Sequence, residues 1–129
     1  MSEVKYNLSH ALCMVYLEMT AADGKFEDSE MEEAAKKVFS WREVFEYDPK
    51  QTWKESLEWF SSFDAPKSRV EAVFNILRLL KEKMSKDALV AIANDLADIG
   101  QADGEVAENE KKFFQAFLEV VGLTFEDLK

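Results

Sequence analysis

Two short segments of the chain carry acidic side chains at the same spacing. Residues 22–30 read Ala-Asp-Gly-Lys-Phe-Glu-Asp-Ser-Glu, and residues 102–110 read Ala-Asp-Gly-Glu-Val-Ala-Glu-Asn-Glu. We call these the acidic segments. Both begin with Ala-Asp-Gly, and an apolar residue, an acid and a glutamate follow at two-residue intervals. Carboxylate oxygens are the ligands that hard divalent cations such as Ca²⁺ and Mg²⁺ prefer. The chemistry that these residue types could perform is therefore cation binding.

Half of each acidic segment matches the calcium loop of an EF-hand. That 12-residue loop has an acidic ligand at position 5, glycine at 6 and a bidentate glutamate at 12. Asp23, Gly24 and Glu30 fall at those positions in the first copy. Positions 1 and 3 would be Met19 and Ala21, which are not carboxylates, and the second copy fails in the same way. We therefore do not expect an EF-hand, and an acidic site of another construction remains open.

The shared glutamates have a second interpretation, in which they stabilise the start of a helix. Glu30 and Glu110 lie at the third helical position if Glu27 and Ala107 are N-caps, and there a carboxylate meets free backbone N–H groups. Such a contact stabilises by ~0.3–1 kcal/mol at an exposed site. However, Glu and Ala are poor N-cap residues, and capping gives no reason for the acid two residues before each glutamate. Both interpretations stay open.

Other site chemistry is nearly excluded by composition. Cys13 is the only cysteine and His10 the only histidine, whereas a structural zinc site needs four such ligands and a di-iron bundle needs two Glu-x-x-His motifs. The chain has no glycine-rich phosphate loop and no Gly-x-Ser-x-Gly motif. We expect no enzymatic activity and no organic cofactor. We also expect His10 to be an ordinary surface or boundary residue.

Composition indicates one compact domain over residues 1–129. Of the 129 residues 47% are hydrophobic, with only four glycines and two prolines, which is typical of a helix-rich folded protein. We find no signal peptide and no membrane-spanning run, and the lone cysteine suits a reducing compartment, so we expect a cytoplasmic protein. The net charge of −10 disfavours nucleic acid and anionic lipid, and it favours cations or a basic protein partner. Solubility alone would also explain this charge, and the oligomeric state is not predicted.

Apolar residues at helical spacing predict an all-α protein of about seven helices. No alternation of period two persists along the chain. Asp48 and Pro49 are typical of a helix start, Ser85 is typical of an N-cap, and Gly122 is typical of a helix end. Thr124 to Asp127 resembles a capping box that opens a last short turn. We expect helices over about 8–22, 27–39, 49–63, 66–84, 86–99 and 108–121, each with one apolar face, and we expect the aromatic residues to lie mainly in the core.

The repeated acidic segment indicates an internal duplication. Each copy follows one helical stretch and precedes another, so each is expected to be a helix, a tight loop and a helix. Because each such unit has a one-sided apolar face, the two units are expected to pack on each other around a pseudo-twofold axis. That arrangement would bring Asp23 and Asp103 within reach of each other.

The two acidic segments, at the start and near the end of a chain of this size, resemble the TerB-like tellurite-resistance family. The second copy, residues 99–104 with 117–123, is most similar to it. The resemblance implies a duplicated all-helical fold in a bacterial cytoplasmic protein linked to tellurite and other chemical stress, without established catalytic activity. It also implies that the acidic residues bind a metal ion. The ligands carried over by position are Asp23, Glu30, Asp103 and Glu110, with Asp28 and Glu108 as second choices.

Two functions from different classes follow. The first is a non-enzymatic stress-response protein that binds Ca²⁺ or Mg²⁺ weakly, with a Kd on the order of 10⁻⁴ to 10⁻³ M. The second is an acidic adaptor or cochaperone-like module that binds a basic protein partner and has no metal site, since an acidic surface accelerates such association.

Overall fold

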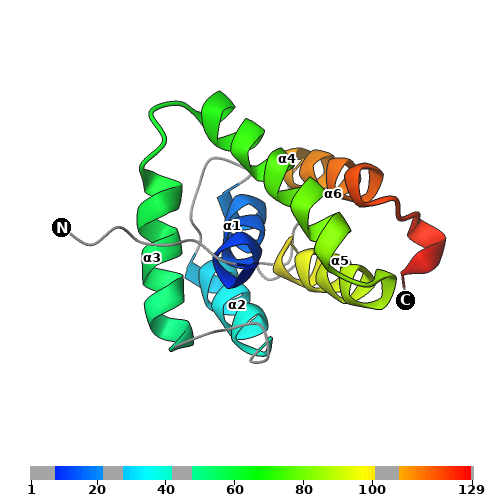
Figure 1. Cartoon of the computed structure of the whole chain (residues 1–129), viewed down its shortest axis with the longest axis horizontal. Helices are drawn as coiled ribbons and strands as arrows, with labels where there is room; N and C mark the ends of the chain where they lie inside the picture. The colour runs from blue at the N-terminus through cyan, green and yellow to red at the C-terminus, as the bar shows by residue number, and fades with distance from the viewer. Residues whose placement is uncertain (1–7, 22–27, 42–47, 101–107, 129) are drawn as a thin grey trace.

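The computed structural model describes residues 8–21, 28–41, 48–100 and 108–128. These residues form six α-helices and one short 3-10 helix, and none of them lies in a strand (Figure 1). The prediction of an all-α fold is therefore confirmed, and the described residues contain six α-helices where about seven helices were expected. The elements are α1 (Leu8–Ala21), α2 (Asp28–Phe39), α3 (Pro49–Ser61), α4 (Pro66–Lys83), α5 (Lys86–Gly100), α6 (Glu108–Val121) and η2 (Phe125–Asp127).

Helix α1 is the centre of the fold. It packs against all five other α-helices, and Figure 1 shows them arranged around it. Every residue from Ser9 to Ala21 is buried. The prediction of a single apolar face was wrong for this helix, because residues 11–17 are apolar without interruption. A helix that is apolar all round must be enclosed on all sides.

The helices that flank the acidic segments pack in the pattern that a duplication predicts. Helix α1 contacts α5, while α2 and α6 each contact both α1 and α5. Exchanging α1 with α5 and α2 with α6 leaves this set of contacts unchanged. The two helix pairs therefore form one shared core, as expected for units that each have an apolar face to bury.

Helices α3 and α4 complete the enclosure of α1. Helix α3 starts as predicted: the Asp48 side chain accepts a hydrogen bond from Lys50 N at 3.1 Å, and Pro49 is the first helical residue. The N-cap of α4 is Ala65, without a side-chain hydrogen bond. Helix α4 packs on α1 and α6, whereas α3 packs extensively only on α1.

The ends of α5 and α6 also follow the sequence signals. Ser85 Oγ accepts a hydrogen bond from Ala88 N at 3.2 Å at the start of α5. After α6, Gly122 has φ +79°, and Leu123 N donates to Leu118 O at 2.8 Å. This is the Schellman arrangement, in which a left-handed residue ends the helix and its last carbonyls are satisfied.

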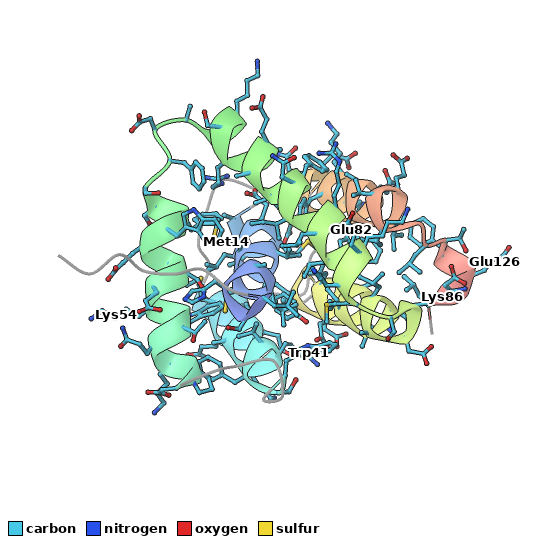
Figure 2. The ribbon with its side chains drawn as sticks, in the orientation of Figure 1. Met14, Trp41, Lys54, Glu82, Lys86 and Glu126 are labelled. Carbon is cyan, nitrogen blue, oxygen red and sulfur yellow. The ribbon has the colours of Figure 1, made fainter. Side chains whose placement is uncertain are left out.

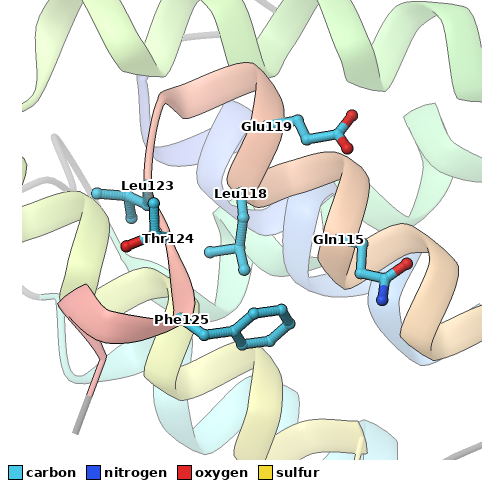
Figure 3. Close-up of a pocket in the computed structure, with 6 residues that line it drawn as sticks. All are labelled: Gln115, Leu118, Glu119, Leu123, Thr124 and Phe125. Carbon is cyan, nitrogen blue, oxygen red and sulfur yellow. The ribbon is translucent and has the colours of Figure 1, made fainter.

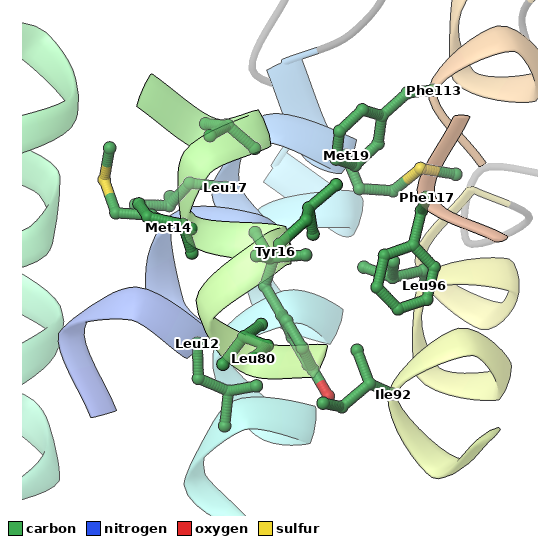
Figure 4. Close-up of a cluster of buried hydrophobic side chains, with 14 of the residues drawn as sticks. Leu12, Met14, Tyr16, Leu17, Met19, Leu80, Ile92, Leu96, Phe113 and Phe117 are labelled. Atoms are coloured by element: carbon green, nitrogen blue, oxygen red, sulfur yellow. The ribbon is translucent and has the colours of Figure 1, made fainter. Parts of the chain in front are cut away.

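The core lies where α1, α4, α5 and α6 meet (Figure 4). Of the ten phenylalanines, Phe60, Phe113 and Phe117 belong to the buried core, with Phe117 fully buried. Several others and the three tryptophans pack half-buried against it. The main exception is Phe125, which is 62% exposed. Within the described parts of the chain, no helix is both long and apolar enough to cross a membrane.

Candidate functional site

Both acidic segments lie between two packed helices, as predicted. Helix α1 ends at Ala21 and α2 begins at Asp28, and α5 ends at Gly100 while α6 begins at Glu108. Asp23 and Asp103 lie outside the residues that the structure describes. The predicted approach of these two side chains therefore stays a prediction.

The remaining predicted ligands lie at the start of α2 and of α6. Asp28 and Glu30 belong to the first turn of α2, and their side chains are outside the described set. Glu108 is the first residue of α6 and is exposed. Glu110, two residues later, is only 1% exposed. The structure therefore separates the two acids of the second segment into one that faces solvent and one that faces inward.

Glu110 shares the inner face of α6 with aromatic core residues. Phe113 and Phe117, three and seven positions further on, are both buried. A carboxylate at this place lies beside the free N–H groups of the first helical turn. Because burying a carboxylate is costly unless it is compensated, the position suits either a helix N-terminus or a cation as the compensating partner. Both interpretations made from the sequence are compatible with this geometry.

The described residues alone do not make a metal site. No group of three or more His, Cys, Asp or Glu side chains in this part of the chain could hold a metal ion. A cation at Glu110 would need further ligands from residues 101–107, which follow α5 and include Asp103. The donor set expected there consists of carboxylate and carbonyl oxygens, which suits hard cations.

The structure also places polar side chains inside the core, where the sequence interpretation did not expect them. His10 on α1 is 0% exposed, and its Nε2 lies 2.8 Å from Glu55 Oε1 on α3. The expectation that His10 is a surface or boundary residue was therefore wrong. Since α1 is enclosed on all sides, a polar residue anywhere on it has no route to solvent.

A second polar contact joins α1 to α4. Glu18 is 4% exposed, and its Oε1 accepts a hydrogen bond from Arg69 Nε at 2.8 Å. A second bond runs from the same guanidinium to Glu18 Oε2 at 3.3 Å. The Arg69 guanidinium also lies 4.5 Å from the centre of the Phe60 ring on α3. This bidentate ion pair compensates the burial of the Glu18 carboxylate, and the planar guanidinium of arginine is well suited to that geometry.

A third polar contact joins α1, Trp41, which is the second residue after α2, and α5. Tyr16 Oη donates to Asp95 Oδ2 at 2.6 Å, and Trp41 Nε1 lies 3.0 Å from Tyr16 Oη and 3.2 Å from Asp95 Oδ2. Burial raises the pKa of Asp95, and the hydrogen bonds from Tyr16 and Trp41 oppose that effect. Burial, followed by the adjacent Asp95 carboxylate, raises the pKa of Tyr16 well above its ordinary value. Tyr16 is therefore a neutral hydrogen-bond donor at physiological pH.

The environment of Cys13 disfavours a redox or nucleophilic role. The side chain is fully buried, and burial raises the pKa of its thiol to about 12, against a smaller opposing effect of a hydrogen bond with Ser56. Reactivity requires the thiolate, which is scarce at such a pKa. Cys13 therefore acts as a small core residue of α1, at its contact with α3.

The fold and these contacts define an all-α protein in which two helix pairs, α1 with α2 and α5 with α6, form one core around the buried helix α1. The family model described as tellurite resistance protein TerB matches residues 9–129, nearly the whole chain. The chain therefore belongs to the TerB tellurite-resistance family, as its acidic segments predict. No curated protein and no solved structure shows significant similarity to the chain.

Proposed function

We propose that this protein binds a hard divalent cation, Ca²⁺ or Mg²⁺, through its acidic segments, without catalysing a reaction. We further propose that it acts in the bacterial cytoplasm as part of a response to chemical stress. Membership of the TerB family supports the link to tellurite stress. The repeated carboxylates support the cation, since oxygen ligands favour hard cations over zinc or copper.

The observation that carries the proposal is the burial of Glu110. Its side chain is 1% exposed at the start of α6, directly after the segment that contains Asp103. An inward-facing carboxylate six residues after Gly104 provides an anchor for a cation that a solvent-facing glutamate would not. Glu30 is the equivalent residue in the first segment, at the start of α2.

The affinity of each site should be modest. One aspartate and one bidentate glutamate supply three oxygens, whereas Ca²⁺ takes six to eight. Backbone carbonyls and water would complete the shell, as in sites with a Kd on the order of 10⁻⁴ to 10⁻³ M. The cation would contribute stability to the ends of the flanking helices, by about 1.4 kcal/mol at ten times Kd.

Thermal melts during a Ca²⁺ or Mg²⁺ titration at constant ionic strength test this proposal. The native protein should gain stability with saturation. The Asp23→Asn/Asp103→Asn variant should show no increase in thermal stability when the cation is added. Glu110→Gln should lose the share of this increase that comes from cation binding at the second acidic segment.

The matched control is Glu71→Gln/Glu82→Gln, which removes two charges from exposed positions on α4 (Figure 2 labels Glu82). It should keep the full gain of the native protein. If the native protein and the Asn variant respond alike to the cation, the acidic segments only stabilise helix starts and the proposal fails.

The alternative function, an acidic module for protein interaction, is favoured by a different part of the molecule. Near the C-terminal end of the described chain, an exposed phenylalanine stands beside an open groove and two exposed glutamates. That surface is independent of the acidic segments.

A further inference from the structure

An open apolar groove lies between α6 and η2. It is lined by Gln115, Leu118, Glu119, Leu123, Thr124 and Phe125, and it has a volume of about 440 Å³ (Figure 3). Leu118 and Leu123 are buried and form its floor, while the ring of Phe125 is 62% exposed. A groove of this size is in the range of ligand sites, which is roughly 300–1,000 Å³. Because it is open, it suits one or two side chains of a larger partner.

The groove is held in a fixed shape. Asp127 Oδ2 accepts a hydrogen bond from Thr124 N at 2.9 Å, and Asp127 Oδ1 lies 3.2 Å from Lys86 Nζ at the start of α5. These two contacts, the backbone hydrogen bond first, lower the pKa of Asp127. The Phe125 ring also packs 6.1 Å from the ring of Phe114 on α6. A site that is ordered before binding loses less conformational entropy when a partner binds.

Exposed carboxylates flank this groove. Glu119 lies on its rim and Glu126 follows Phe125 directly, both are exposed, and in the described part of the chain neither is in an ion pair. The nearby ammonium group of Lys86 is engaged by Asp127, and Figure 2 shows Lys86 and Glu126 at this end of the molecule. Lys112 on the same helix is seven residues from Glu119, or roughly 10 Å along the axis. Lys81 on α4 also reaches this end of the molecule, since its Nζ would lie 3.7 Å from a Cβ atom on Gly122. Glu119, Glu126 and Asp127 together carry one charge more than Lys81 and Lys86, so the local charge beside the apolar floor is still negative, in a chain of net charge −10.

We propose that this groove binds a peptide segment of a protein partner that presents a large apolar side chain next to lysine or arginine. The apolar side chain packs on Leu118 and Leu123 against the face of Phe125, and the neighbouring cation meets Glu119 or Glu126. Charge complementarity of this kind sets orientation and association rate, while the buried apolar anchor supplies most of the affinity. The site shares no residue with the acidic segments, so its test is independent of the test for cation binding.

The test uses ¹⁵N-labelled full-length protein and three blocked pentapeptides, followed by NMR chemical shifts. The first peptide has phenylalanine between two lysines, the second has phenylalanine between two glutamates, and the third has serine between two lysines. We expect the first peptide to shift the amide signals of residues 115–126 in a saturable way. The other two peptides should bind at least about fivefold more weakly.

Variants then assign the binding to the groove. Phe125→Ser should weaken binding of the first peptide about tenfold or more, and Glu119→Gln/Glu126→Gln should weaken it about two- to tenfold. The loss caused by the glutamate variant should vanish in ~1 M salt, where exposed charges are screened. As controls, Leu79→Ser changes the other large apolar residue that is exposed among those the structure describes, on α4, and Glu71→Gln/Glu82→Gln removes two distant charges.

Several outcomes would overturn the proposal. One is the absence of saturable shifts at residues 115–126 with the first peptide, which would make Phe125 an ordinary exposed apolar residue. Another is equal binding of the lysine and glutamate peptides, which would remove the charge argument. Shifts that map to α4 and respond to Leu79→Ser would place the interaction elsewhere. Because Phe125 is mostly exposed, its replacement should leave the thermal midpoint nearly unchanged, and the glutamate variant tests the site without any loss of apolar packing.

Discussion

Three side chains of α1 illustrate how single polar residues behave inside this core. His10 meets Glu55 of α3, Glu18 meets Arg69 of α4, and Tyr16 meets Asp95 of α5. Each contact reaches a different neighbouring helix. Buried polar groups of this kind are costly when they are mispaired, so they favour one rotation and one axial position of α1 among its neighbours.

At this scale we predict how Asp95 affects stability as pH changes. Burial raises the pKa of Asp95 above its ordinary value of 3.8. A carboxyl group of this kind contributes its stability in full below that ordinary value and loses it as pH rises through the raised value. Asp95→Asn keeps an oxygen acceptor for Tyr16 but never ionises. The free energy of unfolding of the variant, relative to the native protein, should therefore increase from about pH 4 to about pH 7.

Urea unfolding at several pH values measures this difference, and Glu82→Gln at an exposed position serves as the control. A relative stability of Asp95→Asn that stays constant or falls over the same interval would show that ionisation of Asp95 does not oppose folding.

At the scale of the element, residues at the helix ends largely determine where one helix stops and the next begins. Asp48 caps α3, Ser85 caps α5, and Gly122 ends α6. The start of α4 shows that this information is incomplete, because its N-cap is Ala65 and provides no side-chain hydrogen bond. Packing on α1 and α6 must therefore stabilise α4.

Gly122 gives the second prediction, because its φ of +79° strains any residue with a Cβ atom. We expect Gly122→Ala to lower the free energy of unfolding by about 1–2 kcal/mol. The added Cβ would lie 3.7 Å from Lys81 Nζ, which is ordinary contact, so the loss comes from the backbone. Gly122→Asn should lower the free energy of unfolding by less, since asparagine tolerates the left-handed region. Denaturant unfolding measures both, and equal losses for the two variants would contradict the explanation.

At the scale of the whole molecule, α1 and α3 differ most in how they are held. Helix α1 packs against five helices, whereas α3 packs extensively on α1 alone. The buried face of α3 includes the small polar residues Thr52 and Ser56 together with Phe60. Smaller additions are the ring contact of Phe39 with Trp53 and the Arg69–Phe60 contact. Trp53, Leu57 and Trp59 of α3 are only partly buried against the core, and Phe60 is its one fully enclosed apolar side chain. Elements with few fully buried apolar side chains open at lower free energy than the core.

We therefore predict two levels of amide hydrogen exchange. Amides within α1 should exchange only through global unfolding, with the free energy and denaturant dependence of the whole molecule. Amides within α3 should exchange through a smaller opening, with a lower free energy and a weaker denaturant dependence. NMR-detected exchange at increasing denaturant concentration measures both, and identical values for the two helices would show that α3 is an integral part of the core.

The amino-acid sequence by itself determined the helix boundaries, the family and the position of the acidic segments. Local signals suffice for boundaries because capping, proline and glycine act within a few residues of the helix end, as at Asp48 and Gly122. The repeated Ala-Asp-Gly segment predicts an internal duplication for the same reason, since it depends only on residue types and spacing.

Only the tertiary structure decided which side chains are enclosed and what they meet. The sequence of α1 predicts burial of its apolar residues, but it does not show that five neighbours would enclose His10 and Glu18 as well. The partners of these side chains lie 45 and 51 residues away in the chain, at Glu55 and Arg69. Likewise, the sequence ranks Glu110 before Glu108 as a ligand only through the family resemblance, and the rotation of α6 against the core exposes Glu108 and buries Glu110. Burial is a property of packed surfaces, so it is fixed when helices that are distant in sequence come together.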